Sequence, residues 1–226
     1  MIQTKYLGVT HQEADIPKEV TLNNAETFMV YMARVSNPQS QIAGLSPERL
    51  LAYCIRRKHW SVFDMVDVIV EVICPRDISR QLTRHHSFRF QEFSQRYAEV
   101  VDFTHRECRL QHATNRQSSI LVDANNPISR RWDEMQQEVL SVALKHYKEA
   151  LAMGVAREQA RALLPEGLTL SRLYAKASVR NWIFYLSVRR DKGTQKEHRE
   201  VAEQVWSIFK EHLPTTAAAV ESLGVL

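Results

Sequence analysis

The stretch VDVIVEVICPRDISRQLTRHHSFRFQEFSQRY, residues 66–97, is the most informative part of the chain. Residues 66–73 are rich in β-branched valine and isoleucine, which is typical of a strand, and Pro75 favours the start of a helix directly after it. We expect that helix to carry Gln81 and Arg84 on one face, because they are three residues apart. The segment beyond Arg84 is expected to pass through a short strand or loop.

The segment Arg84–Tyr97 has a composition that neither a helix nor a strand requires for folding. It contains three arginines, two adjacent histidines, a glutamate and two serines in fourteen residues. Burying so many charges without partners is costly, and a purely solvated surface would be richer in lysine and glutamate. Arginine binds phosphate and carboxylate with two parallel hydrogen bonds, and histidine, serine and glutamine can orient a heterocycle. We therefore interpret the segment as a binding site for anions and planar polar rings.

Composition indicates an ordinary globular protein. The chain has 226 residues, of which 44% are hydrophobic and 25% charged, and we expect one domain over residues 1–226. No apolar run approaches the ~20 residues of a membrane helix, and the N-terminus lacks the apolar core of a signal peptide. We therefore expect a cytoplasmic location and no membrane partner. The net charge of +4 favours anionic ligands in general.

The three cysteines predict neither a disulfide nor a metal site. Cys54, Cys74 and Cys108 are odd in number, widely spaced and form no CxxC pair. We interpret them as buried or incidental thiols of a reducing compartment, and we expect no bound metal.

The remaining patterns predict an α+β fold with a small sheet. Residues 2–10 resemble a first strand, Asn24 can cap a helix to about Val35, and Ser46 with Pro47 begins a helix to about Arg57. The C-terminal half is expected to be mostly helical. Its predicted elements are helices at 128–153, 156–164, 179–190 and 195–212, and an extended segment at 168–178.

The helix predicted at 128–153 carries an apolar stripe. Trp132, Met135, Val139 and Val142 recur at spacings of three and four, so they share one face. Such a stripe packs against a core or against a partner helix. Gly154 is a plausible C-terminal end of this helix.

Four motifs in order resemble the flavin-dependent thymidylate synthases. The first is Ala33-Arg34-Val35-Ser36, and the second is Arg84-His85 with Ser94 and Arg96-Tyr97 at the family spacing. The third is Gly154–Arg161 followed by Leu164-Pro165, and the fourth runs from Arg180 to Arg189 and on to Gln195-Lys196-Glu197. Together the motifs span most of the chain.

The resemblance implies an activity and its cofactors. Members of the family transfer a methylene group from 5,10-methylenetetrahydrofolate to C5 of dUMP, and FAD reduced by NADPH supplies the hydride that completes dTMP. It also implies a homotetramer with active sites shared between subunits. No nucleic-acid partner is expected. Conventional thymidylate synthases use a cysteine nucleophile, and no motif in this sequence indicates one.

The resemblance also assigns residues to roles. Arg189 falls at the family position that contacts the uracil, where a guanidinium would stabilise charge developing on the ring. Its neighbour Arg190 fits better the alternative role of complementing a helix C-terminus. The expected cofactor-binding residues are Ser61, Arg84, His85, His86, Glu92, Ser178 and Arg180. The expected substrate-binding residues are Gln81, Arg84, Glu92, Ser94, Gln95, Arg96, Arg161 and Arg189.

Several positions depart from the family pattern. His86 stands where the family usually has arginine, and Arg89 is a candidate replacement for that charge. Phe184 replaces a polar residue that is common at the flavin site, and Gly193 replaces a histidine found in some members.

These departures keep two alternatives open. The first is a related flavin-dependent C5-methylase that acts on UMP, since the two nucleotides differ only by one 2′-hydroxyl. The second is a basic RNA-binding module, which arginine-rich segments with Phe and Tyr would suit. The near balance of 30 basic and 26 acidic residues argues against RNA binding.

Overall fold

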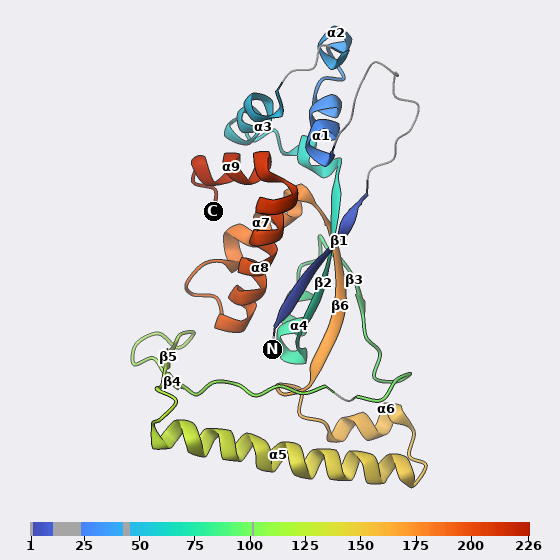
Figure 1. The fold of residues 1–226 in the computed structure, drawn as a ribbon, viewed down its shortest axis with the longest axis vertical. Helices are drawn as coiled ribbons and strands as arrows, with labels where there is room; N and C mark the ends of the chain where they lie inside the picture. Colours follow the sequence, from blue (N-terminus) through green and yellow to red (C-terminus); the bar gives the residue numbers. More distant parts are fainter. Residues whose placement is uncertain (1, 11–23, 43–45, 101) are drawn as a thin grey trace.

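The computed structural model describes residues 2–10, 24–42, 46–100 and 102–226. It is an α+β structure, as predicted, built on a four-stranded antiparallel sheet with strand order β1-β2-β6-β3 (Figure 1). A second sheet consists of β4 and β5 alone. The strands are β1 (Gln3–Thr10), β2 (Asp67–Pro75), β3 (Arg89–Glu92), β4 (Arg109–Gln111), β5 (Ser119–Leu121) and β6 (Leu170–Ser178).

Helices make up most of the remaining described chain. The α-helices are α1 (Ala25–Ala33), α2 (Pro38–Ile42), α3 (Pro47–Arg56), α4 (Arg76–Leu82), α5 (Pro127–Ala152), α6 (Arg157–Ala160), α7 (Val179–Arg189), α8 (Lys196–His212) and α9 (Pro214–Ser222). Two 3-10 helices, η1 (Trp60–Asp64) and η2 (Arg161–Leu163), complete the set. The helices predicted from sequence match α1, α3, α5, α7 and α8 within about three residues, whereas α2, α9 and the β4–β5 hairpin were not predicted.

One face of the sheet holds the core. Val68, Val70 and Val72 of β2 are buried, and they alternate with half-exposed residues as a strand with one covered face requires. Figure 1 shows α7, α8 and α9 together on one side of this sheet. Trp182 of α7 is fully buried, and its indole Nε1 donates to the carbonyl of Val68 at 3.1 Å. This bond satisfies the only polar group of the indole and fixes α7 on the sheet.

The helix α5 stands apart from this core. It has 26 residues, yet only Gln136, Leu140 and Tyr147 are buried. Figure 1 shows it lying across one end of the molecule, away from the main sheet. The predicted apolar stripe is therefore exposed within one chain, and Val139 and Val142 keep 51% and 57% of their surface accessible. Of the two predicted roles for the stripe, the core role is wrong.

One structural expectation at the motif is also wrong. Gln81 lies in α4, but α4 ends at Leu82 and Thr83 is its C-cap. Arg84 therefore lies in the turn after the helix and does not share a helix face with Gln81. The chain has to leave the helix here because it reverses within seven residues to enter β3, which pairs with β6.

We predict that Gly154→Ala destabilises the protein by about 1 kcal/mol, because Gly154 has φ +84° and ends α5 in a left-handed conformation. No atom lies within 4 Å of the position that a Cβ would take, so the cost is conformational alone. Urea unfolding measures it. The matched control is Gly167→Ala, which also meets no atom within 4 Å and has no positive φ. We expect the control to stay within about 0.5 kcal/mol of the parent. Equal effects of the two substitutions would contradict the explanation.

Candidate active site

Arg189 and His85 meet where the ends of α4 and α7 come together. Nε of Arg189 donates to Nε2 of His85 at 3.1 Å. A ring nitrogen that accepts carries no proton, so the imidazole is neutral and protonated at Nδ1. Burial, followed by the charge of Arg189, lowers the pKa of His85 to about 4. The guanidinium of Arg189 thus lies beside a neutral ring, and its two Nη groups have no partner among the described residues.

Gln81 lies in the same region and joins α4 to α8. Its Nε2 donates to Oε1 of Gln195 at 2.7 Å, and its Oε1 is 3.2 Å from Nδ1 of His198. Gln195 in turn donates from Nε2 to Oε2 of Glu197 at 3.0 Å. These contacts form one continuous hydrogen-bonded chain from Glu197 to His198.

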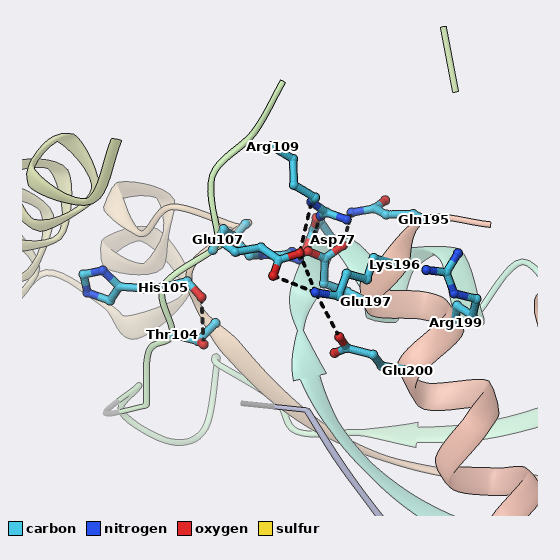
Figure 2. Close-up of polar contacts among 12 residues, drawn as sticks. Asp77, Thr104, His105, Glu107, Arg109, Gln195, Lys196, Glu197, Arg199 and Glu200 are labelled. Atoms are coloured by element: carbon cyan, nitrogen blue, oxygen red, sulfur yellow. Dashed lines mark hydrogen bonds and ion pairs between the residues drawn. The ribbon is translucent and has the colours of Figure 1, made fainter. Parts of the chain in front are cut away.

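Glu197 is the anion at the start of that chain. Its Oε1 accepts a hydrogen bond from Arg109 and lies 3.2 Å from Nη1 of Arg106. Arg106 also donates to Asp77 of α4. Burial alone would raise the pKa of Glu197, but the hydrogen bond from Arg109 and both guanidinium charges hold it at about 2. Figure 2 shows Arg109 and Gln195 converging on Glu197 above the start of α8.

His198 lies behind Gln81 and is fully buried. Burial, the charge of Arg189 and the neighbouring His85 together lower the pKa of its imidazole to about 3. Its ring centroid lies 6.3 Å from that of His85 and 5.7 Å from that of Tyr185.

Two expected cofactor residues form a second group at the start of α7. Oγ of Ser178 and Nη1 of Arg180 donate to the two carboxylate oxygens of Asp64, at 2.7 and 2.8 Å. Nε of Arg180 is buried and has no hydrogen-bond partner among the described residues. Arg180 also lies 5.6 Å from the ring of Phe184, whose own ring contacts Trp60 at 4.9 Å. Ser61 is exposed in the adjoining η1.

Two expected phosphate-binding arginines form a third group. Nε of Arg96 lies 3.3 Å from Oε2 of Glu158, and Nε of Arg161 donates to the carbonyl of Glu158 at 3.3 Å. The Ser94 hydroxyl accepts from the backbone of Arg96. Gln95 is buried, and its Nε2 has no hydrogen-bond partner among the described residues. Its side chain is therefore not solvated.

Glu92 holds the sheet to α4 rather than facing Gln81. Its Oε1 accepts from Oγ of Ser79 at 2.6 Å and from Oγ of Ser171 at 2.8 Å. Its Oε2 lies 3.6 Å from Nη1 of Arg80. Most of its hydrogen-bonding capacity is thus used within the chain, which a sequence motif could not reveal.

The structure therefore joins His85 with Arg189, with Gln81 linked to them only through His198, and it joins Ser178 with Arg180 and Arg96 with Arg161. Arg84 and His86 are exposed beside the first group. Among the contacts of the described residues, none links one group to another. Arg180 and Arg189 lie at opposite ends of α7, about 14 Å apart along its axis.

A large cleft adjoins the first group. It has a volume of about 1350 Å³, and Gln195, Glu197 and Arg109 line it from one side. Trp132, Met135 and Val139 of the exposed α5 stripe also line it. An open apolar wall next to a charged one is typical of a surface that binds a ligand or another protein.

The sequence interpretation missed His198, Arg106 and Arg109 as members of the site. For His198 a signal was present, because it precedes Val201 and Val205 by three and seven residues and so lies on the apolar face of α8. A histidine on such a face is buried and needs a polar partner. For the two arginines no local signal exists, since they lie in an extended segment far from α8 in the sequence.

Two of the three cysteines are buried, whereas Cys108 is half-buried. Cys54 and Cys74 are buried, and burial together with the charges of Glu92 and Asp77 raises the pKa of Cys74 to about 12. A thiol with that pKa is inert at neutral pH.

We predict that acid destabilises the protein through the half-buried His85 and the buried His198. Both imidazoles have pKa values far below the ordinary 6.5, so the unfolded chain binds their protons first. The contribution of these two histidines to the free energy of unfolding is therefore fully present above pH 6.5, and it is lost as the pH drops toward 4. Urea unfolding at pH values of about 7.5 and 5 measures this change. In His198→Asn the loss over this interval should be smaller; an equal loss would contradict the assignment.

Comparison with known proteins identifies the family. Residues 19–215 match the model of a family described as thymidylate synthase complementing protein. The chain is 42% identical over 221 residues to a flavin-dependent thymidylate synthase of Synechocystis sp., covering 97% of this chain and all of that one. It is 40% identical over 202 residues to a protein named as a probable flavin-dependent thymidylate synthase of Paramecium bursaria Chlorella virus 1, covering 88% and 92% of the two chains.

Solved structures show the same fold. The UMP/dUMP methylase PolB of Streptomyces cacaoi, bound with 5-Br dUMP, superposes with a TM-score of 0.83 at 24% identity, covering all of this chain and 97% of that one. The same protein bound with 5-Br UMP gives a TM-score of 0.80 at 26% identity, covering all of this chain and 96% of that one. The four ordered motifs, the matching family model and the full-length relatives lead to one conclusion: the chain belongs to the flavin-dependent thymidylate synthases, the enzymes that convert dUMP to dTMP.

Proposed function

We propose that the protein methylates dUMP at C5 with 5,10-methylenetetrahydrofolate as the one-carbon donor and FAD reduced by NADPH as the hydride source. A cytoplasmic location is part of the same proposal. The observation that carries it is the junction of α4 and α7, where the guanidinium of Arg189 lies beside the neutral ring of His85 with both Nη groups unpartnered among the described residues. By resemblance Arg189 occupies the family position that contacts the uracil, and a cation with unpartnered Nη groups would suit that role.

The role that we assign to Arg189 is electrostatic. As C5 of the uracil becomes nucleophilic, negative charge spreads over the ring, and a preorganised guanidinium stabilises it. The contrast with Arg190 supports this assignment. Nε of Arg190 pairs with Glu203 at 3.1 Å, and its guanidinium lies 5.0 Å from the ring of Trp206. Arg190 therefore has structural partners, whereas the Nη groups of Arg189 have none among the described residues.

We assign the nucleotide phosphate to Arg96 and Arg161. Both guanidinium groups gather around Glu158 at one point of the surface, and two adjacent arginines match a phosphate dianion. Ser94 and the buried amide of Gln95 lie in the same loop and complete the expected contacts. Gln81 and Glu92 are proposed to contact the nucleotide from the α4 side.

The residues present fit a bound flavin dinucleotide. Nε of Arg180 is buried and unpartnered among the described residues, which marks a place for an acceptor group of a ligand. Ser178, Ser61 and Glu92 would add polar contacts, and Arg84, His85 and His86 would hold the other end beside Arg189. When bound, the flavin supplies a hydride to the one-carbon unit. The separation of about 14 Å along α7 suits an elongated dinucleotide.

We propose that the active enzyme is a homotetramer with shared sites. In one chain the uracil group of Gln81 and Arg189 has no described contact with the phosphate group of Arg96 and Arg161. One nucleotide would need both groups, and a second copy can supply the missing one. The exposed apolar stripe of α5 supports self-association, because such a surface is costly in water.

A second candidate substrate is UMP. Its support is the structural relative at 26% identity, which is named a UMP/dUMP methylase and was solved with 5-Br UMP. The RNA-binding interpretation is replaced by the family assignment.

We predict that Arg189→Ala lowers dTMP formation by about 100-fold or more while FAD stays bound, because the lost charge acts on the developing ring charge. Product formation measures the first effect and flavin absorbance the second. Arg190→Ala is the matched control, since it removes the same charge from the next residue, and it should retain most activity. Loss of FAD from the Arg189 variant would overturn the division between catalytic and cofactor-binding residues.

We further predict that two inactive variants complement each other. Arg189→Ala and Arg96→Ala damage different groups, so mixed tetramers with shared sites contain some sites with neither defect. Unfolding and refolding the two together should restore turnover above that of either variant refolded alone. If the mixture is no more active than its components, each site lies within one chain.

A further inference from the structure

The hydrogen-bonded chain from Glu197 to His198 can run in one direction only. Glu197 is ionised and can only accept hydrogen bonds, so the nearby amide of Gln195 must present its NH2 group. Gln195 then turns its oxygen toward Gln81, and Gln81 must present its own NH2 group in return. The oxygen of Gln81 therefore points to His198, whose Nδ1 must carry a proton.

The two ends of the network are buried, whereas its two amides are half-buried. The side chain of Glu197 is 9% exposed and His198 is wholly buried, so reversing one amide would set two like groups against each other at a buried end. Two arginines hold the carboxylate in its charged form, as Figure 2 shows for Arg109. The direction set at Glu197 is thus transmitted through two amides to α4.

His198 has no other described hydrogen-bond partner. Its Nε2 is buried and unpartnered, and its only described hydrogen bond is with the amide oxygen of Gln81. A phenylalanine or leucine would fill an apolar position equally well and would bury no unpaired nitrogen. The imidazole therefore acts on Gln81.

We propose that Glu197, Gln195 and His198 are positioning residues that fix the orientation of the Gln81 amide, so that it offers one N–H donor and one oxygen lone pair to the nucleotide at constant places. The proposal rests on the proposed function only in taking Gln81 as a nucleotide contact. The network has two ends: the carboxylate sets its direction, and the imidazole caps it.

The first test needs no substrate. Long-range ¹H–¹⁵N spectra of protein labelled at histidine distinguish the two neutral tautomers, and comparison with His198→Asn assigns the signal of His198. We expect His198 to be protonated at Nδ1 in the FAD-bound parent and to show a mixture of tautomers in Glu197→Gln. An Nε2-protonated ring in the parent would overturn the proposal.

The second test measures dUMP binding to the FAD-bound protein by calorimetry. Glu197→Gln keeps the size of the side chain but allows the amides to run either way, so we expect dUMP affinity to fall about tenfold. The control Glu200→Gln makes the same change on α8, at an exposed residue whose described ion pair is with Lys196, at 3.9 Å. It should bind dUMP as the parent does.

A double variant separates direction from charge. In Gln195→Glu with Glu197→Gln, the carboxylate moves one step along the chain and still accepts from Gln81, so its amide keeps the original orientation. We expect dUMP affinity to return to within about threefold of the parent. A double variant as weak as Glu197→Gln alone would show that only the charge at 197 matters.

At the other end of the network, two substitutions of His198 leave the charges around Glu197 unchanged. Asparagine at 198 places an N–H near the position of Nδ1, whereas leucine fills similar space with no donor. We expect His198→Asn to bind dUMP within about threefold of the parent and His198→Leu about tenfold more weakly. Equal affinities of the two variants would contradict the positioning role. If the parent itself binds FAD but no dUMP, the proposed function fails, whereas the tautomer test still decides the network.

Discussion

The ion pairs of Glu197 are the interaction on which the polar half of the molecule depends. This carboxylate lies at the start of α8, and it receives Arg109 and Arg106 from the extended segment before and within β4. Arg106 continues to Asp77 in α4, so three parts of the chain that are distant in sequence are held by one charge. Because the ends of α4 and α8 are fixed in this way, Gln81 and His85 stand at defined positions against Arg189 of α7. A lost partner here would leave an uncompensated buried charge, which costs about 3–5 kcal/mol.

The order and type of the main elements could be predicted because their signals are local. A few neighbouring residues are enough to recognise each of them: the valines at alternate positions of β2, the Asn24 cap and the apolar face of α8. The end of α4 was misplaced because the chain must turn into β3, and that pairing with β6 joins residues about 80 positions apart. The polar network could not be predicted from the sequence for the same reason. Arg109 and Glu197 are 88 residues apart, and no pattern in either segment indicates the other. Family motifs supplied the residue types of the site, whereas only the fold shows that Glu92 is largely engaged by Ser79 and Ser171.

The division of the expected site into separate groups is a consequence of the architecture. The sheet positions α4 and α7 so that His85 and Arg189 meet, while β3 carries Ser94 and Arg96 toward α6 and Arg161. The helix α5, with only three buried residues in 26, adds an apolar surface beside this arrangement. The uncovered stripe and the separation of these groups within one chain are the two observations from which we propose self-association with shared sites.

The most direct test of the central claim is a product assay by mass spectrometry. Purified protein would receive FAD, NADPH, 5,10-methylenetetrahydrofolate and equal amounts of dUMP and UMP. The proposed function predicts that dTMP forms and that UMP is left unchanged. A methylated UMP, or no product from protein that has bound flavin, would contradict it.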